Sequence, residues 1–159
     1  MKIVVMSDTH MSRVTGEFEE ICSRYCTDAD LVIHLGDWTS NSVLSFLEQY
    51  PLEAVSGNMD DYTVRDLLPP KKVIAVKGLR FGLAHGWGSP VGLRRRLINE
   101  FEGVHAILFG HTHEPLRVEE NSIFWFNPGS VTMGRGGHYT GSLGILHVDE
   151  TIESEIVAL

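Results

Sequence analysis

The first ten residues, Met1-Lys2-Ile3-Val4-Val5-Met6-Ser7-Asp8-Thr9-His10, decide the fold class of this chain. Residues 3–6 form a short apolar run that is typical of a buried strand. The run leads into a carboxylate and an imidazole, Asp8 and His10, which are groups that bind divalent metal ions. The same arrangement, an apolar run followed by a short polar motif, recurs along the chain.

Helices and strands are predicted to alternate in the first third of the chain. One helix is expected over residues 16–25. A second is expected over residues 41–50, because Asn41-Ser42 can cap its start and Pro51 would end it. Strands are expected over 31–35 and 52–55, and each leads into a glycine-containing turn. This β-α-β-α-β order predicts a parallel sheet with right-handed crossovers.

Hairpins predominate in the rest of the chain. Residues 73–76 and 79–84 are joined through Lys77-Gly78, and a helix is expected from Ser89-Pro90 to residue 101. Further strands are expected over residues 106–109, 117–119, 123–126, 143–148 and 152–157. The apolar run 123–126 is assigned to the core in preference to a dimer interface. The fold class is therefore α/β, with largely antiparallel pairing in the second half.

Composition restricts the class of protein. With 159 residues, 43% of them hydrophobic and 21% charged, the chain is expected to form one domain, residues 1–159. A net charge of −8 argues against binding along a nucleic-acid backbone, but not against a small phosphorylated substrate. No apolar run is long enough to span a membrane, and the N-terminus does not resemble a signal peptide. Cys22 and Cys26 are expected to be reduced, partly buried thiols of a cytoplasmic protein.

Seven potential metal ligands lie in five motifs, namely Asp8-Thr9-His10, Gly36-Asp37, Gly57-Asn58-Met59-Asp60, His85-Gly86 and Gly110-His111-Thr112-His113. The carboxyl ends of parallel strands share one edge of a sheet, where ligands bind. Residues two apart in an extended chain face the same side, so Asp8 with His10, and His111 with His113, can each aim at one ion. Two Asp, one Asn and four His suffice for two divalent ions, which most often serve phosphate-ester chemistry.

Each motif taken alone has a simpler interpretation. Asp8 is equally well a cap of the following segment, and Gly36-Asp37 is typical of a turn. Asn58 alone is typical of an Asx-turn, and His85 of a packed or surface histidine. The set argues for metal binding, because seven side chains of ligand type in this order seldom arise from packing.

The order D-x-H, G-D, G-N-x-D, H-G, G-H-x-H resembles that of calcineurin-like metallophosphoesterases, from residue 1 to at least residue 130. The short chain and its Asn127-Pro128-Gly129-Ser130 segment are similar to the compact phosphodiesterases of the YfcE type. The resemblance implies two mixed β-sheets packed as a sandwich and flanked by helices, with a dimetal centre at the strand ends. It also implies that the first metal is held by Asp8, His10, Asp37 and His113, and the second by Asp37, Asn58, His85 and His111.

The activity implied is that of a dimetal-dependent phosphodiesterase. A hydroxide shared by the two ions would attack phosphorus in line with the leaving oxygen, without a covalent intermediate. Asp37 is expected to bridge the ions, and the expected catalytic residues are Asp37, Asn58, His85 and His111. The mixture of oxygen and imidazole ligands favours Mn²⁺, with Ni²⁺, Fe²⁺ or Zn²⁺ as alternatives. No organic cofactor is expected, and the expected partner is a small phosphate ester.

One position departs from the larger family, in which a His that protonates the leaving group often follows the metal-binding Asn. Met59 occupies this position, and a thioether has no proton to donate. Because general-acid catalysis contributes about 10²–10⁴-fold, slow turnover of alkyl esters and a preference for good leaving groups are expected. Asp60 is expected to orient Asn58 or a metal-bound His.

Other functions remain open. One is a different hydrolase activity, on phosphomonoesters or dinucleoside polyphosphates, and another is a non-catalytic protein-binding scaffold of the same fold, as in the retromer complex. Nuclease activity is disfavoured by the negative charge. All four ligand histidines are present, which favours catalysis over a scaffold. A homodimer also remains open.

The remaining polar and aromatic candidates receive lesser roles. His34 is expected to pack or to support a ligand, whereas the histidines without a motif are expected to face solvent: His105, His138 and His147. The run Arg94-Arg95-Arg96 is expected to be the solvated face of a helix, with phosphate attraction as the alternative. Trp87 is assigned equally to packing and to stacking on an aromatic or nucleoside group, and Arg135 to an approach to substrate oxygens.

Overall fold

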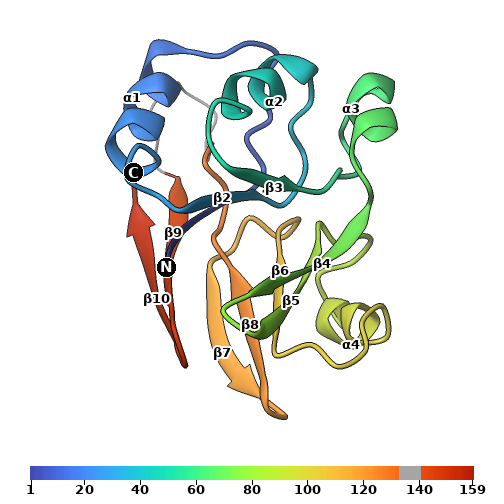
Figure 1. The fold of residues 1–159 in the computed structure, drawn as a ribbon. Helices are drawn as coiled ribbons and strands as arrows, with labels where there is room; N and C mark the ends of the chain where they lie inside the picture. The colour runs from blue at the N-terminus through green and yellow to red at the C-terminus, as the bar shows by residue number, and fades with distance from the viewer. Residues whose placement is uncertain (133–140) are drawn as a thin grey trace.

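The computed structural model describes residues 1–132 and 141–159, and it places two five-stranded sheets face to face (Figure 1). The first sheet has the order β10-β9-β1-β2-β3, built from Ile152–Ala158, Ser142–Val148, Lys2–Met6, Leu31–His34 and Leu52–Ala54. The second sheet has the order β4-β5-β6-β8-β7, built from Lys71–Val76, Leu79–Ala84, Ala106–Phe109, Ile123–Asn127 and Leu116–Glu120. The helices are α1 (Gly16–Tyr25), α2 (Asn41–Leu47), α3 (Tyr62–Leu67) and α4 (Leu93–Ile98).

Both sheets are mixed, as predicted. In the first sheet β1, β2 and β3 are parallel, whereas β9 and β10 join as an antiparallel hairpin. In the second sheet β5, β6 and β8 are parallel, and β4 and β7 pair antiparallel at its two edges. The parallel strands of each sheet therefore deliver their carboxyl ends to one side of the molecule.

Strand β1 shows how the layers form. Ile3 and Val5 point into the apolar layer between the two sheets, and Val4 and Met6 point into the layer beneath α1 and α2. A strand buried on both faces has no polar face, which explains its unbroken apolar sequence. A third apolar layer lies between the second sheet and α4, so helices flank both outer faces of the sandwich (Figure 1).

Helix α1 spans the predicted residues. The Thr15 side chain caps it by accepting a hydrogen bond from Phe18 N at 3.3 Å, which satisfies an amide of the first turn. Cys22 and Cys26 are both free and buried against the first sheet, more completely than expected.

Two predicted helices have other bounds in the structure, and one further helix was not predicted. The helix expected over 41–50 ends at Leu47, and Ser40 rather than Asn41-Ser42 stands at its N-cap, with its hydroxyl donating to Met11 O. The helix expected over 90–101 spans only α4, because Ser89 forms a local turn to Val91 N and Gly92 is left-handed (φ 74°).

Helix α3 was not predicted, although the Asp61 side chain caps it by accepting a hydrogen bond from Val64 N. Its six residues bury one side chain, so the apolar period was too short to detect.

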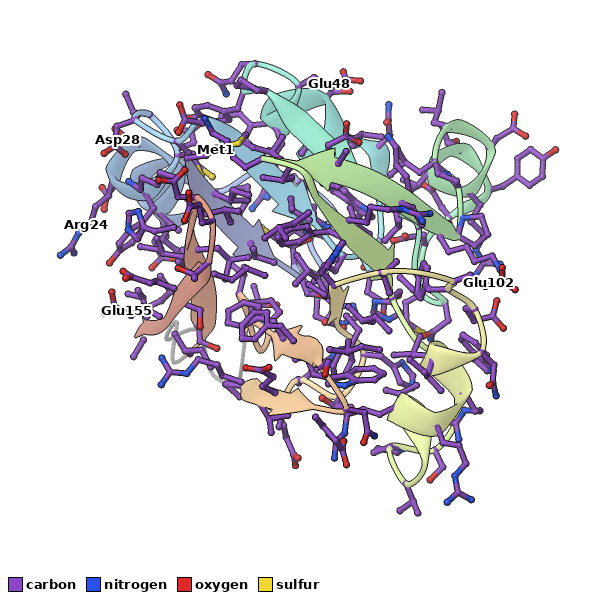
Figure 2. All side chains as sticks on the ribbon, turned by 60° about the horizontal axis from the view of Figure 1, so that its bottom comes forward. Met1, Arg24, Asp28, Glu48, Glu102 and Glu155 are labelled. Atoms are coloured by element: carbon purple, nitrogen blue, oxygen red, sulfur yellow. The ribbon has the colours of Figure 1, made fainter. Side chains whose placement is uncertain are left out.

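Apart from the buried carboxylates Asp8, Asp37 and Asp60, the charged side chains of the described residues lie at least partly on the surface. Arg24, Glu48 and Glu155 extend away from the sheets, as Figure 2 shows. Within the described ranges, no helix has the length and apolar character needed to cross a bilayer.

Candidate metal centre

The five motifs predicted from the sequence meet where the strand ends of the two sheets converge. β1 and β2 lead to Asp8 and Asp37, and their loops are joined by the hydrogen bonds Asp8 N to Gly36 O (3.0 Å) and His10 N to Asp37 O (3.0 Å). The two sheets are tied together by His111 N, which donates to Asp8 Oδ2 at 3.1 Å, and by His85 Nδ1, which donates to Leu35 O at 2.8 Å. The site is therefore shared by both sheets.

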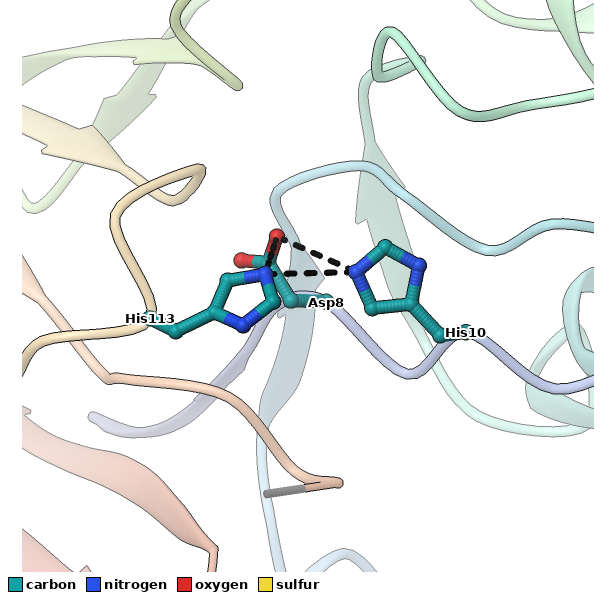
Figure 3. Close-up of side chains that lie close together, drawn as sticks. All are labelled: Asp8, His10 and His113. Atoms are coloured by element: carbon teal, nitrogen blue, oxygen red, sulfur yellow. Dashed lines mark hydrogen bonds and ion pairs between the residues drawn. The ribbon is translucent and has the colours of Figure 1, made fainter. Parts of the chain in front are cut away.

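Asp8, His10 and His113 form a first group of possible ligands (Figure 3). Asp8 Oδ1 lies 3.0 Å from His113 Nε2 and 3.7 Å from His10 Nε2, and the two imidazole nitrogens are 3.2 Å apart. Two ligands each about 2.1 Å from one ion, at angles between 90° and 109°, are about 3.0–3.4 Å apart. Two of the three separations fall in this range, so the group fits a single cation with little adjustment.

Asp8, Asp37 and His85 form a second group. His85 Nε2 lies 3.2 Å from Asp37 Oδ2 and 3.9 Å from Asp8 Oδ1. Asp37 Oδ2 is also 3.7 Å from His10 Nε2, so this carboxylate lies between the two groups. Asp8 belongs to both groups as well, so two carboxylates, and not Asp37 alone, stand between the positions that ions would occupy.

Asn58 and His111 complete the second side of the site. His111 Nε2 donates to Gly88 O at 2.8 Å, which leaves Nδ1 with a lone pair directed at Asn58 Oδ1, 3.0 Å away. Two acceptors facing each other at this distance are suited to a cation. The His111 ring is 5.3 Å from the His85 ring, so this pair adjoins the second group.

The hydrogen bonds around the ligands leave specific atoms without a partner. Ser7 Oγ and His111 N both donate to Asp8 Oδ2, and Leu35 O accepts from His85 Nδ1. The remaining atoms, Asp8 Oδ1 and His85 Nε2, are buried and have no hydrogen-bond partner in the described part of the chain. Buried polar atoms are rarely left in this state, and here both face the space that the other ligands surround. The donor set therefore fits divalent ions.

The charges in the site favour ionised carboxylates and protonated imidazoles. Burial alone would raise the pKa of Asp8, but His10, His113 and His85 outweigh it and hold that pKa well below its usual range. Burial likewise opposes ionisation of Asp37, whose pKa His85 lowers. Asp8 raises the pKa of His113, and Asp37 raises that of His85 against the effect of burial. Without metal, protons thus provide the positive charge that ions would bring, and binding would release them.

The extended geometry expected for the motifs was wrong. Asp8, His10, His111 and His113 have left-handed backbones, with φ of 55°, 47°, 70° and 57°. Asp8 and His10 do share a group, but His111 and His113 point to different ones, His111 to Asn58 and His113 to Asp8. The structure brings all seven expected ligands together, and their role in binding metal remains a prediction.

Several supporting residues differ from expectation. Asp60 accepts hydrogen bonds from Thr39 N (2.9 Å) and Gly57 N (2.6 Å), so it joins two motif loops through the backbone and not through the side chain of Asn58 or of a ligand histidine. Asn127 was given no role, yet it donates to Gly110 O at 2.9 Å and fixes the loop that carries the histidines His111 and His113. Its place in the quoted Asn127 to Ser130 segment was the available signal.

The arginine run is not a uniformly solvated face. Arg95 is exposed, but Arg94 pairs with Glu120 and lies over the Trp125 ring. Arg96 donates to the backbone carbonyls of Trp87 and Val91, at 2.9 and 3.1 Å, and of Ser89. No local pattern predicts this role, because the acceptors are main-chain atoms.

The other candidates are placed as follows. His34 is fully buried, stacks on Trp38 with ring centroids 3.5 Å apart and contacts Thr9 Oγ1 at 3.3 Å, as a supporting residue would. His105 and His147 are exposed, as predicted. The predictions for Arg135 and His138 fall outside the described residues.

Two hollows lie near the site. A cavity of about 470 Å³ includes Asn58 and His85 in its wall and extends along Trp87. Another, of about 650 Å³, lies between α4 and the β7–β8 hairpin, and none of the seven expected ligands lines it. Only the first is continuous with the candidate metal centre.

Comparisons with known proteins agree with this geometry. Residues 1–151 match the calcineurin-like phosphoesterase superfamily domain. A probable metallophosphoesterase of Methanothermobacter thermautotrophicus is 34% identical over 99% of this chain and 92% of its own length. Phosphodiesterase YfcE of Escherichia coli K12 is 33% identical over 60% of this chain and 52% of its own length. A solved structure of Escherichia coli YfcE, described as a phosphoesterase, covers 99% of both chains with a TM-score of 0.69 and 25% identity.

The same fold is found in Vps29, a protein that is not named as a phosphoesterase. Vps29 of Entamoeba histolytica, in a structure described as a complex with Zn²⁺, covers 99% of both chains with a TM-score of 0.74. Its 21% identity shows a common fold and nothing further.

Proposed function

The chain belongs to the calcineurin-like phosphoesterase superfamily, and from that premise we propose that it is a dimetal-dependent phosphodiesterase acting on small phosphate esters. The observation that carries the proposal is a pair of buried atoms without a hydrogen bond, Asp8 Oδ1 and His85 Nε2, within two overlapping groups of ligand-type side chains. Their close polar neighbours, His113 Nε2 at 3.0 Å and Asp37 Oδ2 at 3.2 Å, are ligand-type atoms as well. Gathering carboxylates and imidazoles in a buried place costs stability unless protons or metal ions balance their charge, and a scaffold has no need of such a group.

The seven side chains divide into two ligand sets in this proposal. His10 and His113 hold one ion, Asn58, His85 and His111 hold the other, and Asp8 and Asp37 lie between them. Bound divalent ions would supply a nucleophile by lowering the pKa of water and would neutralise charge on the phosphoryl oxygens. The oxygen and imidazole donors favour Mn²⁺, with Ni²⁺, Fe²⁺ or Zn²⁺ as alternatives.

The chain's own groups orient the ligands and the substrate. The Leu35 carbonyl fixes the His85 tautomer, and the Gly88 carbonyl fixes that of His111, so that each presents its other nitrogen to the site. Met59 is 60% exposed, and its backbone N–H donates to Asp37 Oδ1 at 2.7 Å, which holds this carboxylate in place. Its thioether provides no proton for the leaving oxygen, so substrates with acidic leaving groups are favoured.

Phosphomonoester hydrolysis is the nearest alternative. A monoester dianion needs additional positive charge, which arginine pairs commonly supply. Among the described residues, Arg65 is the arginine that contacts an expected ligand, and its guanidinium donates to the backbone oxygen of Asn58 at 2.5 Å. This argues for the singly charged diester as the better substrate. The cytoplasmic location and a single domain over residues 1–159 remain predictions.

The test is metal add-back to chelator-stripped protein. We expect Mn²⁺ to restore hydrolysis of bis(4-nitrophenyl) phosphate, with Mg²⁺ weaker, and we expect lower kcat/KM for 4-nitrophenyl phosphate. Stripped and reloaded protein with no turnover of either ester in any of Mn²⁺, Ni²⁺, Fe²⁺ or Zn²⁺ would favour the scaffold. Activity on the monoester alone would favour the phosphomonoesterase.

Asp37→Asn tests the ligand assignment. Loss of a carboxylate charge next to both ions should lower kcat/KM more than about 100-fold and reduce bound metal below that of the parent protein. The matched control is Asp66→Asn, an exposed carboxylate on α3, which should change neither quantity. Unchanged metal content in Asp37→Asn would remove Asp37 from the ligand set.

A further inference from the structure

The cavity beside the candidate metal centre has the size of a small-molecule site. Its volume of about 470 Å³ lies within the range of about 300–1,000 Å³ that ligand pockets occupy. Asn58 and His85, which are expected ligands of the second ion, form one end of its wall. A phosphoryl group held at the metal centre would therefore direct one of its ester arms into this cavity.

The walls of the cavity are largely apolar. Pro70, Ala84 and the glycines Gly57 and Gly86 contribute surfaces without charge. Trp87 also lines it and is 42% exposed, although an indole of this size is normally covered in a folded protein. A flat, partly exposed aromatic ring in a cavity wall is suited to stacking on another planar group.

The loop that carries Trp87 is held in place. Arg96 donates to the carbonyls of Trp87, Ser89 and Val91, so three backbone positions of the loop are attached to α4. A fixed platform avoids the entropic cost of ordering a side chain and loop when the ligand binds. The exposure of Trp87 is thus a feature of a preformed surface.

The charged side chains that line the cavity favour ligands that carry hydrogen-bond acceptors. Lys71 pairs with Glu100 at 2.6 Å, so these two charges compensate each other. Within residues 1–132 and 141–159, no carboxylate forms an ion pair with Arg65, whose guanidinium donates to the neutral Asn58 carbonyl. Acceptor atoms on the edge of a planar arm, such as the carbonyl oxygens of a nucleobase, would meet this guanidinium.

We propose that this cavity is the binding site for one ester arm of the substrate, and that the arm is a planar aromatic group that stacks on Trp87. The inference rests on the proposed phosphodiesterase function and specifies its substrate class. An aryl group and a nucleobase share this chemistry, and the experiment below separates them.

The test measures binding of product-like ligands to the Mn²⁺-loaded protein by isothermal titration calorimetry. Phenylphosphonate is compared with methylphosphonate, and uridine 5′-monophosphate with ribose 5-phosphate. Because stacking on an aromatic side chain contributes about 1–3 kcal/mol, we expect the aromatic member of each pair that stacks to bind about 5- to 160-fold more tightly. Preference within the first pair alone indicates an aryl arm, and preference within the second pair indicates a nucleoside arm.

Variants of Trp87 test whether the preference for aromatic ligands depends on its indole ring. Trp87→Ala should reduce the aromatic-to-alkyl ratio to within about twofold of unity, and Trp87→Phe should retain most of it. Neither change removes the backbone carbonyl to which Arg96 donates. The matched control is Val91→Ala, which removes an exposed apolar side chain of the same loop that does not line the cavity, and it should leave the ratio unchanged.

Failure of this inference can be separated from failure of the proposed function. Equal binding of aromatic and alkyl ligands by a protein that hydrolyses the diester, or a ratio that Trp87→Ala leaves intact, overturns the aromatic subsite alone. Absence of metal-dependent turnover, together with no binding of either phosphonate, overturns the phosphodiesterase proposal and the subsite with it.

Discussion

At the scale of single residues, the site depends on backbone conformations that side chains other than glycine rarely adopt. Five of the seven expected ligands have positive φ angles: Asp8, His10, Asp37, His111 and His113. Each such residue costs about 1–3 kcal/mol and persists only where its surroundings fix it. Here the fixing contacts include the hydrogen bond from Ser130 Oγ to Asp8 O at 2.8 Å. The left-handed backbone turns each side chain out of its strand direction toward the common centre.

His34 gives a prediction of pH dependence for the metal-free protein. Burial lowers its pKa to about 3, whereas an unfolded histidine has a pKa of about 6.5. Between these values the unfolded chain binds one proton more than the folded protein, so stability falls as the pH falls from 6.5 toward 3. The expected slope from this group is about 1.4 kcal/mol per pH unit.

Between about pH 4.5 and 6.5, the other groups of the site with shifted pKa values contribute little to the pH dependence of stability. His85 and His113 have raised pKa values, so their stabilising effect is already complete below about pH 6.5. Asp8 and Asp37 have lowered pKa values, so their contribution to the stability of the folded protein is lost only below the usual carboxyl pKa of about 4. Urea unfolding in chelator should give a flatter profile for His34→Gln than for the parent protein. Identical slopes would show that His34 is protonated in the folded state.

At the scale of the elements, the motif loops fit together so closely that glycine is required. A Cβ on Gly57 would lie 2.2 Å from both Asp37 N and Asp37 Oδ1, and the first of these is backbone that cannot move aside. Gly57 is therefore more than a turn residue, because the Asp37 loop rests directly on its backbone. This contact, with the hydrogen bond from Met59 N to Asp37 Oδ1 (2.7 Å), holds together the loops of two expected ligands, Asp37 and Asn58.

Gly57→Ala should accordingly destabilise the protein. We expect a loss of about 1–3 kcal/mol in the free energy of unfolding, with weaker metal binding, because the Asp37 loop must shift. Gly16→Ala is the matched control, since a Cβ at the start of α1 meets no atom within 4 Å and should leave stability equal or slightly higher. A neutral Gly57→Ala in urea unfolding would contradict the close fit.

Arg96 gives a second prediction at this scale. By holding the loop of residues 87–91, it positions the Gly88 carbonyl that accepts from His111 Nε2. Arg96→Gln should weaken binding of the second ion about 10-fold and leave the first unchanged, because groups that orient a ligand typically contribute 10–100-fold. Calorimetric titration of stripped protein with Mn²⁺ would resolve the two ions, with the exposed Arg95→Gln as control. Equal weakening in both variants would refute the positioning role.

At the scale of the whole molecule, the metal centre lies at the junction of the two sheets. Asp8, Asp37 and Asn58 follow strands of the first sheet, and His85 and His111 follow strands of the second. Ions bound by both sets would hold the sheets together at this edge. Without them, the two buried carboxylates depend on protonated histidines, His85 and His113, for their countercharge.

Metal binding should therefore raise the melting temperature. At a free Mn²⁺ concentration of 100 times Kd, one site adds about 2.7 kcal/mol, and for a chain of this length that corresponds to about 5–10 °C. Asp8→Asn should lose most of this rise, because Asp8 belongs to both ligand groups. Scanning calorimetry with and without Mn²⁺ measures the difference. A rise of the same size in Asp8→Asn would place the bound metal elsewhere.

Most of the fold could be predicted from local pattern. The sequence pattern located the ten strands of the described residues to within two residues at either end. Central strands such as β2 and β6 are buried throughout and read as unbroken apolar runs, whereas edge strands such as β4 alternate between exposed and partly buried residues. The helices were less predictable, since their ends depend on side-chain contacts distant in sequence. Ser40, for example, donates to Met11 O and is thereby kept outside α2.

The sequence by itself determined the inventory of the site: which donors are present, that each follows a strand, and that Met59 leaves no proton donor after Asn58. These are properties of residue type and order. Only the tertiary structure decided how the donors divide, with His111 and His113 on different sides, Asp8 shared by both groups and Arg96 attached to the Trp87 loop. The physical reason is that left-handed backbones and main-chain acceptors leave no periodic pattern in a sequence, and their energies are set by contacts between the two sheets.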